Sequence, residues 1–486
     1  MQQLKRNMNI NGMTIMMTMR KVFVSALMMM HVLIVNSCKA STEGGVGDEL
    51  FMTDKVCDIR IDMPQETWKE IVGKPHDKEY HVCSVTIDGV RMDSVGIRTK
   101  GASSLDDVKA MGSDRYSFTL KLNKYRKGQK YSGMTKILLN NNIWDATQMK
   151  DAIVYDMCRF IALPAPRTNY ARVTLNGSYF GCYLVVEPVD KHFCKRNYKG
   201  TKSNIYKPYH NLSYTTDNMT DYKDIADFAK VNGGEASMQR IIEALKSVHE
   251  MKDIEKHVDV EAVMKYMAVQ SMAVNYDCMT GKNVQNYYLR EAEGKLSLIP
   301  WDYNLAWGGY PEEDGEEDGM PAGSAPMNWG EATSFEMAID AESYGKAATS
   351  RIVNLPVDVP FFGDPSKREF FMNLLTVSEY KAMYYHYLDL LCNQYIIGGG
   401  LERSMTGING KIGEYAGCER NAFYDNARFH KAGSTLRKLL TMRARSVLGQ
   451  MDGTIPATWE GQKQHPGKLI DSDGIDIQDL GGLMVK

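Results

Sequence analysis

The chain has 486 residues, of which 43% are hydrophobic and 24% are charged, a composition typical of a folded globular protein with one large or two medium domains. Its 58 lysines and arginines nearly balance its 60 aspartates and glutamates, so the formal net charge is −2. This balance excludes the strong basic excess found in many nucleic-acid-binding proteins, and we expect no nucleic acid as a partner.

The N-terminus has the features of a lipoprotein signal peptide. Four basic residues between positions 5 and 21 precede an apolar run at residues 22–35, which is short for a transmembrane helix. The Val-Asn-Ser-Cys sequence that ends at Cys38 resembles a lipoprotein signal-peptidase site. We expect residues 1–37 to be removed and Cys38 to carry a lipid, so that the body is exported and anchored to the membrane at the cell envelope or cell surface. An uncleaved anchor helix is the alternative, and it exports the body as well.

The composition divides the remaining chain into a tether, a body and a tail. Several glycines and the absence of apolar periodicity predict a tether at residues 38–50. The body is expected at residues 51–453 and the tail at residues 454–486. Residues 469–480 superficially resemble a calcium loop, but they lack its ligand spacing and terminal glutamate. We therefore expect the tail to be a loose β-strand appendage.

Eight cysteines remain besides Cys38. An exported chain is able to form disulfides, but the sequence does not show which cysteines would pair. The chain has no Cys-x-x-Cys pair, which argues against a zinc ribbon or a thioredoxin-type redox site. Cys278 adjoins a candidate catalytic aspartate, and we expect it to be a buried structural thiol.

The first part of the body is predicted to be rich in β-structure. Period-two alternation of apolar residues predicts strands at residues 57–63 and 82–91. Two further strands, at residues 167–175 and 179–186, flank Asn176-Gly177, which is a strong signal for a hairpin turn.

Two stretches of this part have residues suited to binding an anion. The stretch 96–104 places Arg98 and Lys100 beside a glycine and two hydroxyls, either as an anion-binding turn or as a plain β-turn with solvated charges. A predicted strand at residues 116–122 follows, with Lys121 near its end. In protein kinases the phosphate-binding lysine follows the Gly-rich loop in the same way.

Residues 149–163 have apolar residues at helical spacing and predict a helix that ends before Pro164. Protein kinases pair their phosphate-binding lysine with a glutamate on such a helix. This helix has Asp151 but no glutamate, which weakens the case for Lys121. We therefore interpret the helix as part of the core.

A further candidate follows the hairpin. Glu187 begins a Glu-Pro-Val-Asp run in the position of a kinase hinge, which would join the β-rich half to a helical half.

Residues 275–309 place two acids and an amide in turns beside predicted strands. Asp277 follows a predicted helix, Asn286 precedes a Tyr-Tyr-Leu strand, and the next strand ends in Pro-Trp-Asp302. Protein kinases have the same order, with a catalytic aspartate that receives the proton of the acceptor hydroxyl, a metal-binding asparagine and a metal-binding aspartate. The interval between Asp277 and Asn286 is longer than in the usual kinase loop, so the comparison depends on order and element type. Such residues in loops also commonly serve only as turns or caps.

The body resembles the CotH family, which comprises spore coat protein H and its relatives, from about residue 51 to about residue 453. The family motifs are specific only in combination. They include Asp277, Asn286-Tyr-Tyr-Leu and Pro-Trp-Asp302, and the runs at residues 96–104, 115–118, 139–142, 145–147, 176–183, 186–190 and 204–208. The resemblance implies an α+β, atypical protein-kinase-like fold with a β-rich N-terminal half and a helical C-terminal half. It also implies the use of ATP and a divalent metal to phosphorylate Ser or Thr of extracellular or coat proteins.

Lys207 lies in a Tyr-Lys-Pro run that resembles a motif of this family, and this resemblance makes it a second candidate for the phosphate-contacting lysine. An exposed lysine at a strand end is its alternative interpretation.

The second half is predicted to be mainly helical. Helices are expected at residues 238–248, 260–274, 367–394 and 432–451, with their apolar faces in the core. An acidic run at residues 311–318 follows the Pro-Trp-Asp turn. Most such runs are only solvated, but this one is also suited to attracting a basic protein substrate.

The leading hypothesis is an exported enzyme that transfers the γ-phosphoryl group of ATP to Ser or Thr hydroxyls of a protein, for example a basic and Ser-rich one. Asp277 would orient and deprotonate the acceptor, and Asn286 and Asp302 would hold Mg²⁺ or Mn²⁺, which suit oxygen ligands. The nucleotide-binding candidates are Arg98, Lys100, Lys121, Glu187 and Lys207. Two alternatives remain open: a catalytically silent surface-binding or adhesion module, and an enzyme that transfers AMP to proteins. Nothing in the sequence indicates the paired carboxylates of a sugar cleft.

Overall fold

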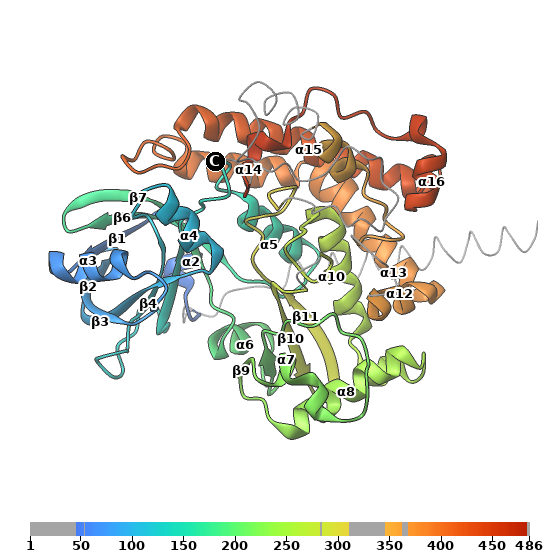
Figure 1. Cartoon of the computed structure of the whole chain (residues 1–486), viewed down its shortest axis with the longest axis horizontal. Helices are drawn as coiled ribbons and strands as arrows, with labels where there is room; N and C mark the ends of the chain where they lie inside the picture. Colours follow the sequence, from blue (N-terminus) through green and yellow to red (C-terminus); the bar gives the residue numbers. More distant parts are fainter. Residues whose placement is uncertain (1–44, 53, 282–283, 311–345, 362–367, 484–486) are drawn as a thin grey trace, which may run out of the picture. The chain divides into compact units, whose positions relative to one another are not determined.

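The computed structural model describes residues 45–52, 54–281, 284–310, 346–361 and 368–483 (Figure 1). From Val46 onward these residues belong to one compact unit. The expected signal peptide, Cys38, most of the tether and the acidic run at residues 311–318 lie outside the described residues. None of the described helices is both long enough and apolar enough to cross a membrane.

The N-terminal part of this unit is a closed barrel with the strand order β1-β2-β3-β4-β5-β7-β6. Neighbouring strands are antiparallel, except that β1 and β6 are parallel and close the barrel. The strands are β1 Cys57–Asp62, β2 His81–Ile87, β3 Val90–Lys100, β4 Ser117–Lys121, β5 Lys136–Asn140, β6 Thr168–Leu175 and β7 Ser178–Val186. Their alternating apolar residues fill the barrel, as Ile59, Val85 and Ile97 show by being fully buried.

The predicted hairpin at Asn176-Gly177 is confirmed. Both residues have positive φ values, 47° for Asn176 and 82° for Gly177, as the favoured two-residue hairpin turn requires. The stretch 96–104 differs from the expected turn, because residues 96–100 are the end of β3 and pair with β4. Arg98 and Lys100 therefore project from a strand and not from a loop of backbone amides.

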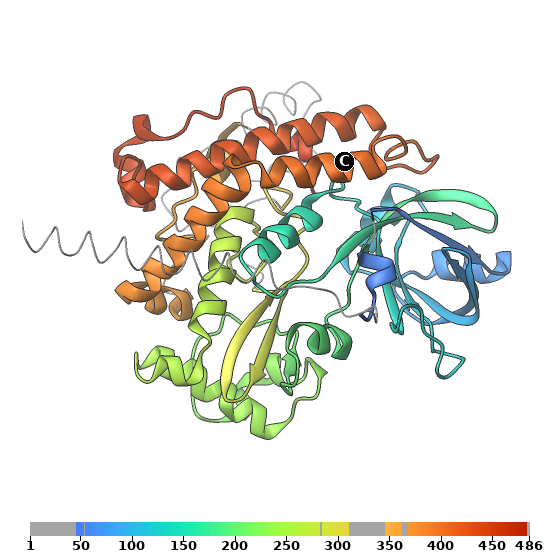
Figure 2. The ribbon, with the colours of Figure 1, turned by 180° about the vertical axis from the view of Figure 1, so that it is seen from behind.

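The C-terminal part combines a second sheet with helices. The sheet has the order β11-β10-β8-β9, with β8 Asn204–Tyr206, β9 Ala229–Val231, β10 Tyr287–Ala292 and β11 Lys295–Pro300. Every residue of β10 is buried, because β10 has neighbours on both edges and helices α8 and α10 pack against the sheet (Figure 2). The sheet thus gives a rigid support to the turns at both of its ends.

The helices lie outside the two sheets or between them. In chain order they are α2 Asp48–Phe51, α3 Gln65–Gly73, α4 Ser103–Ala110, α5 Lys150–Phe160, α6 Lys191–Asn197, η1 Met219–Tyr222, α7 Lys223–Ala226, α8 Glu235–His249, α9 Ile254–His257, α10 Val260–Ala273, α12 Glu369–Thr376, α13 Ser378–Asp389, the π-helix η3 Leu390–Ile397, α14 Gly400–Ile412, α15 Asn426–Asp452, α16 Trp459–Gln464, η4 Pro466–Lys468 and η5 Ile477–Leu480. Helix α5 leaves the barrel after β5 and packs against α10, so it links the barrel to the helical part.

Three features of the fold differ from the sequence expectations: the start of the body, one helix and the tail. The folded body begins before residue 51, because Leu50 is fully buried and Gly47 N–H donates to Ser132 O at 2.7 Å. The helix expected at residues 367–394 is interrupted at Val377, which has an extended conformation. The tail is not a loose β-strand: it folds into short helices whose apolar residues, including Leu480, are buried in the core.

All eight described cysteines are free thiols. Seven of them are buried, and Cys418 is exposed. Cys278 is fully buried, as expected, and its thiol lies 2.8 Å from Asn275 O and 3.0 Å from Thr280 Oγ1. It is therefore held as a structural group beneath the candidate site.

Candidate functional site

Asp302 lies in the turn that follows β11, and helix α5 holds this turn. Asp302 N–H donates to Tyr155 Oη at 3.0 Å, and the next amide, Tyr303 N–H, donates to Asp151 Oδ1 at 2.7 Å. Asp302 has a φ of 64°, which is unusual for a residue other than glycine. Among the described residues its carboxylate has no hydrogen-bond donor and no ion-pair partner, so the fold fixes the backbone and leaves the carboxylate available to a ligand.

Asp277 and Asn286 meet in the segment between α10 and β10. Asn286 Nδ2 donates to Asp277 O at 2.7 Å and to Asp277 Oδ2 at 2.9 Å, and Gln285 Nε2 donates to Asp277 Oδ1 at 2.6 Å. The amide nitrogen of Asn286 is therefore fully used in hydrogen bonds to Asp277. The amide oxygen has no donor within the described ranges and is the free end of the side chain. Gln285 was not anticipated from the sequence.

Lys100 ends β3 and reaches across β4, so that its Nζ donates to Asn140 Oδ1 on β5 at 2.5 Å. Burial lowers the pKa of the Lys100 amine, and the charges of Asp302 and Asp151 oppose this effect. Both carboxylates are thus close enough to act on the amine across the junction of barrel and helices. Lys100 is therefore one phosphate-contacting candidate on which Asp302 acts electrostatically.

Lys207 follows β8 and approaches the same turn from the second sheet. Its Nζ lies 5.8 Å from the centroid of the Trp301 ring and 6.0 Å from that of Tyr288. Burial lowers the pKa of the Lys207 amine, Asp302 opposes this effect, and Lys100 adds to it. The amine has no hydrogen-bond acceptor or carboxylate partner in the part of the chain that the structure describes.

Asp151 is the acid that the sequence reasoning assigned to the core. It is buried, and burial together with the neighbouring Asp302 raises the pKa of its carboxyl to about 7. Lys100 acts in the opposite direction. We call Lys100, Asp151, Lys207, Asp277 and Asp302 the charged cluster. Its members come from different elements, and the charge of Asp302 acts on the pKa values of Lys100, Asp151 and Lys207.

Three other predicted residues have different surroundings. Lys121 is exposed, and it pairs with Gly96, four residues along β3 from Lys100, which separates the two lysines by about 13 Å. Arg98 is half-buried, donates to Thr99 O at 3.1 Å and lies over the Tyr80 ring. Its charge still contributes to lowering the pKa of Lys100.

Glu187 is committed to an ion-pair network. Its carboxylate lies 3.2 Å from Arg167 Nη2 and 2.5 Å from Arg196 Nη2, and it also accepts from the backbone N–H of Arg167 at 3.1 Å. The side chain is almost completely buried. Glu187 therefore joins the last barrel strand to α6. Because its carboxylate is already paired with two arginines, it is not available to bind a nucleotide.

The oxygen atoms at the site fit a hard divalent cation. Asp302 offers a carboxylate without a protein partner, and Asn286 offers its amide oxygen. Across the described ranges, no three or more His, Cys, Asp or Glu side chains are grouped closely enough to hold a metal ion. Mg²⁺ commonly binds to one or two carboxylates and takes its remaining ligands from water and substrate phosphates, so a small protein ligand set is compatible with it.

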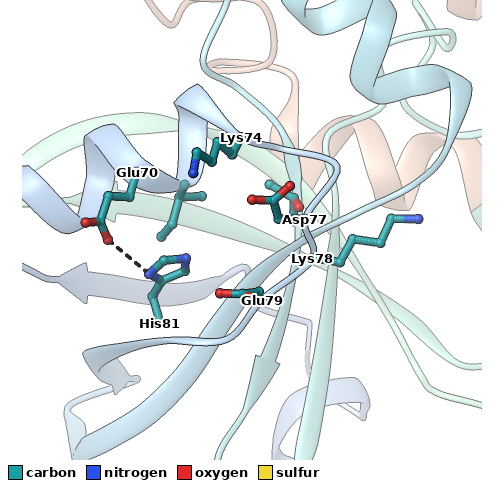
Figure 3. A pocket seen from close by; sticks show the side chains of 8 residues that line it. Glu70, Lys74, Asp77, Lys78, Glu79 and His81 are labelled. Atoms are coloured by element: carbon teal, nitrogen blue, oxygen red, sulfur yellow. Dashed lines mark ion pairs between the residues drawn. The ribbon is translucent and has the colours of Figure 1, made fainter.

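A separate pocket of about 250 Å³ lies on the barrel between α3 and β2 (Figure 3). Charged side chains of both signs line it, and His81 Nδ1 lies 3.6 Å from Glu70 Oε2. Thr99 also lines the pocket. Because successive side chains of a strand point to opposite faces, this pocket lies on the other face of β3 from Arg98 and Lys100.

Comparisons with known proteins give a family, one relative and one solved structure. The family model described as CotH kinase protein matches residues 97–447. Inner spore coat protein H of Bacillus subtilis (strain 168) is 27% identical over 190 residues, which are 37% of this chain and 51% of that protein. The match thus spans about half the length of the relative.

The solved structure is the toxin–antitoxin complex of HipA, HipB and operator DNA from Shewanella oneidensis MR-1. It aligns with 65% of this chain and 72% of that chain, at 11% identity and a TM-score of 0.21, which is too low to support an argument about the fold. The family match, in contrast, includes most of the barrel, the second sheet and the whole charged cluster. The chain therefore belongs to the CotH kinase protein family.

Proposed function

We propose that this chain is an exported, atypical protein kinase that transfers the γ-phosphoryl group of ATP to Ser or Thr hydroxyls of extracellular or cell-surface proteins, with Mg²⁺ or Mn²⁺. The family description supports a kinase-like enzyme. The observation that carries the proposal is the charged cluster, in which the carboxylate of Asp302, without a protein partner among the described residues, acts electrostatically on the buried amines of two lysines, Lys100 and Lys207. Phosphoryl transfer depends on this kind of preorganised charge.

A protein-kinase-like arrangement of the two halves is part of the proposal. The barrel ends with β7, and residues 187–190 then lead into the second sheet and the helices. The first half supplies Lys100, and the second supplies Lys207, Asp277 and Asp302. A kinase likewise places its nucleotide between a β-rich and a helical half.

The residues of the charged cluster would divide the work. A bound divalent cation would neutralise charge on the phosphate oxygens. Asp302 and the Asn286 amide oxygen would hold this cation. Lys100 and Lys207 would contact the phosphates, and each offers a compact positive charge for this purpose. Asp151 would hold the Asp302 turn through the Tyr303 amide, which makes it a positioning residue.

Asp277 would orient the acceptor hydroxyl and receive its proton. Both of its carboxylate oxygens accept amide hydrogen bonds from Gln285 or Asn286, and these bonds fix the orientation of the carboxylate. A carboxylate oxygen is able to accept more than one hydrogen bond, so an acceptor hydroxyl would also be able to donate to Asp277. The acceptor proton would move to an Asp277 oxygen as the hydroxyl attacks.

The proposed location and partners follow from the N-terminal sequence and the relative. Cys38 would carry a lipid that anchors the protein to the membrane of the cell envelope. The relative is a spore coat protein by its name, which supports a place at the cell surface or outside the cell. A basic, Ser-rich protein is the proposed substrate, because the acidic run at residues 311–318 would attract it.

The test is label transfer to a basic, Ser-rich test protein with Mg²⁺ or Mn²⁺. Wild-type protein is expected to transfer label from γ-labelled ATP, and Asp302→Asn to lose at least about 10²-fold of this activity. Asp227→Asn is the matched control, because Asp227 is exposed and outside the cluster. Label from α-labelled ATP instead would show AMP transfer. No label from either nucleotide would reject the kinase and favour a binding module.

A further inference from the structure

The last described residues return to the candidate site. We call residues 475–483 the C-terminal strap. Ala146 N–H donates to Leu480 O at 3.0 Å, and Leu483 N–H donates to Gly309 O at 2.8 Å. Lys150 Nζ donates to Gly481 O at 3.2 Å. The strap thus contacts the loop before α5, the first residue of α5 and the segment that follows Asp302.

Helix α15 holds the other side of the strap. Asp479 is 6% exposed, and its carboxylate lies 2.7 Å from Lys431 Nζ and 3.1 Å from Thr435 Oγ1. Ile477 and Leu480 are buried in the large core of the helical part. The strap is therefore fixed to the body by apolar packing and by a largely buried carboxylate.

Gly482 makes the closest approach between the strap and the site. A Cβ atom at Gly482 would lie 2.6 Å from Gly309 O and 2.8 Å from Gly309 Cα. Both are backbone atoms, which do not rotate away as a flexible side chain does. A Cβ atom at Gly309 would in turn lie 3.0 Å from Lys150 Nζ. Two glycines are thus what allows the strap, α5 and the segment after Asp302 to pack together.

The segment 302–309 is consequently held at both ends. Asp151 and Tyr155 of α5 bind its first two amides, as described above. Trp307 N–H donates to Ala273 O and Val274 O, each at 3.1 Å, and the strap binds Gly309. A shift of the strap would release one end of the segment and would also move Lys150, whose neighbour Asp151 holds the other end.

We propose that the C-terminal strap is a positioning element of the site: its close packing on Gly309 and its bond to Lys150 fix the segment 302–309 and thereby the position of Asp302. The strap lies beyond the family match, which ends at residue 447. The effect on the rate of transfer rests on the proposed function. The effect on the conformation of the segment does not.

The test compares Gly482→Ala with Gly467→Ala in the full chain. Gly467 lies in the same tail, and a Cβ atom there would meet nothing within 4 Å. In hydrogen exchange followed by mass spectrometry, peptides that contain residues 303–310 and Ala146 are expected to exchange about tenfold faster in Gly482→Ala and unchanged in Gly467→Ala. If Gly482→Ala does not fold, Asp479→Asn is expected to accelerate the same peptides. Unchanged exchange in the folded variant would overturn the proposal.

Kinetics of phosphoryl transfer give the second readout. Gly482→Ala is expected to lower kcat by about tenfold with the KM for ATP little changed, because a misplaced Asp302 affects the transfer more than nucleotide binding. Faster exchange with a normal kcat would overturn the positioning role. If the wild-type chain transfers no label at all, the kinase proposal fails, and hydrogen exchange alone decides whether the strap holds the segment.

Discussion

Replacing Arg115 by methionine tests how the barrel is joined to the helical part. Arg115 precedes β4, and its Nη1 lies 2.7 Å from an oxygen of Glu419 in the segment between α14 and α15. The two side chains are 2% and 0% exposed. Arg115 Nη2 also donates to Cys182 O at 2.6 Å, and the guanidinium lies 5.1 Å from the centroid of the Phe423 ring. In contrast, apart from this contact with Arg115, neither oxygen of Glu419 has a partner among the described residues.

This asymmetry sets the expected size of the effect. Removing one partner of a buried ion pair costs about 3–5 kcal/mol, because the other charge is left without compensation. For Arg115→Met the loss of stability should approach the upper end of this range, because Arg115 is the only partner of the Glu419 carboxylate among the described residues. Glu419→Met should cost less, because the guanidinium keeps Cys182 O and the Phe423 ring. The double variant should recover most of the loss, since well-packed apolar residues commonly replace a buried pair at little cost.

Urea unfolding of the four proteins measures these free energies. Arg91→Met is the control, because Arg91 pairs with Asp93 at 3.0 Å on the exposed surface and its loss should cost at most about 1 kcal/mol. If Arg115→Met loses no more stability than Arg91→Met, the buried pair does not join the two parts as we describe. A double variant no more stable than Arg115→Met would show that lost packing, and not a stranded charge, explains the effect.

Three further predictions concern the site and the start of the body. The folded state raises the pKa of Asp151 to about 7, so the free energy of unfolding should fall as the pH rises from about 4 to about 7. Asp151→Asn should lose part of this dependence in urea unfolding at pH 5 and pH 8, and an unchanged dependence would contradict the assignment. Gln285→Ala should lower kcat about tenfold, because it removes a 2.6 Å bond to Asp277, and an unchanged kcat would mean that this bond does not orient the carboxylate. Leu50→Ala should lower the free energy of unfolding by about 2–5 kcal/mol, whereas a true tether residue would have no effect.

The local features of the fold were predictable from the sequence. Alternation of apolar residues located β1, and the Asn176-Gly177 pair located the β6–β7 hairpin, because both signals act within a few residues. The Pro-Trp-Asp302 turn was correctly placed at the end of a strand for the same reason. The prediction for the tail was wrong. Its apolar residues are buried against α15 and near Gly309, and these contacts are distant in the sequence and leave no local pattern.

The lysines and acids of the site show why the rest was not predictable. Lys100 and Lys121 are both near strand ends, and only the closure of the barrel decides that one is turned toward Asp302 and the other is exposed. Glu187 directly follows β7, but two arginines from other elements form ion pairs with its carboxylate. Asp151 was assigned to the core because the sequence gives no sign of its hydrogen bond to the Tyr303 amide, which joins residues far apart in the chain.

The most direct test of the central claim compares Lys100→Met with Lys121→Met in transfer from γ-labelled ATP. Both changes remove one ammonium group from neighbouring strands, but only Lys100 belongs to the charged cluster. Lys100→Met should lose about 10²–10³-fold in kcat, the size expected for removing one preorganised charge, and Lys121→Met should retain wild-type activity. Equal activity of the two variants, or a loss confined to Lys121→Met, would contradict the assignment of phosphoryl transfer to the charged cluster.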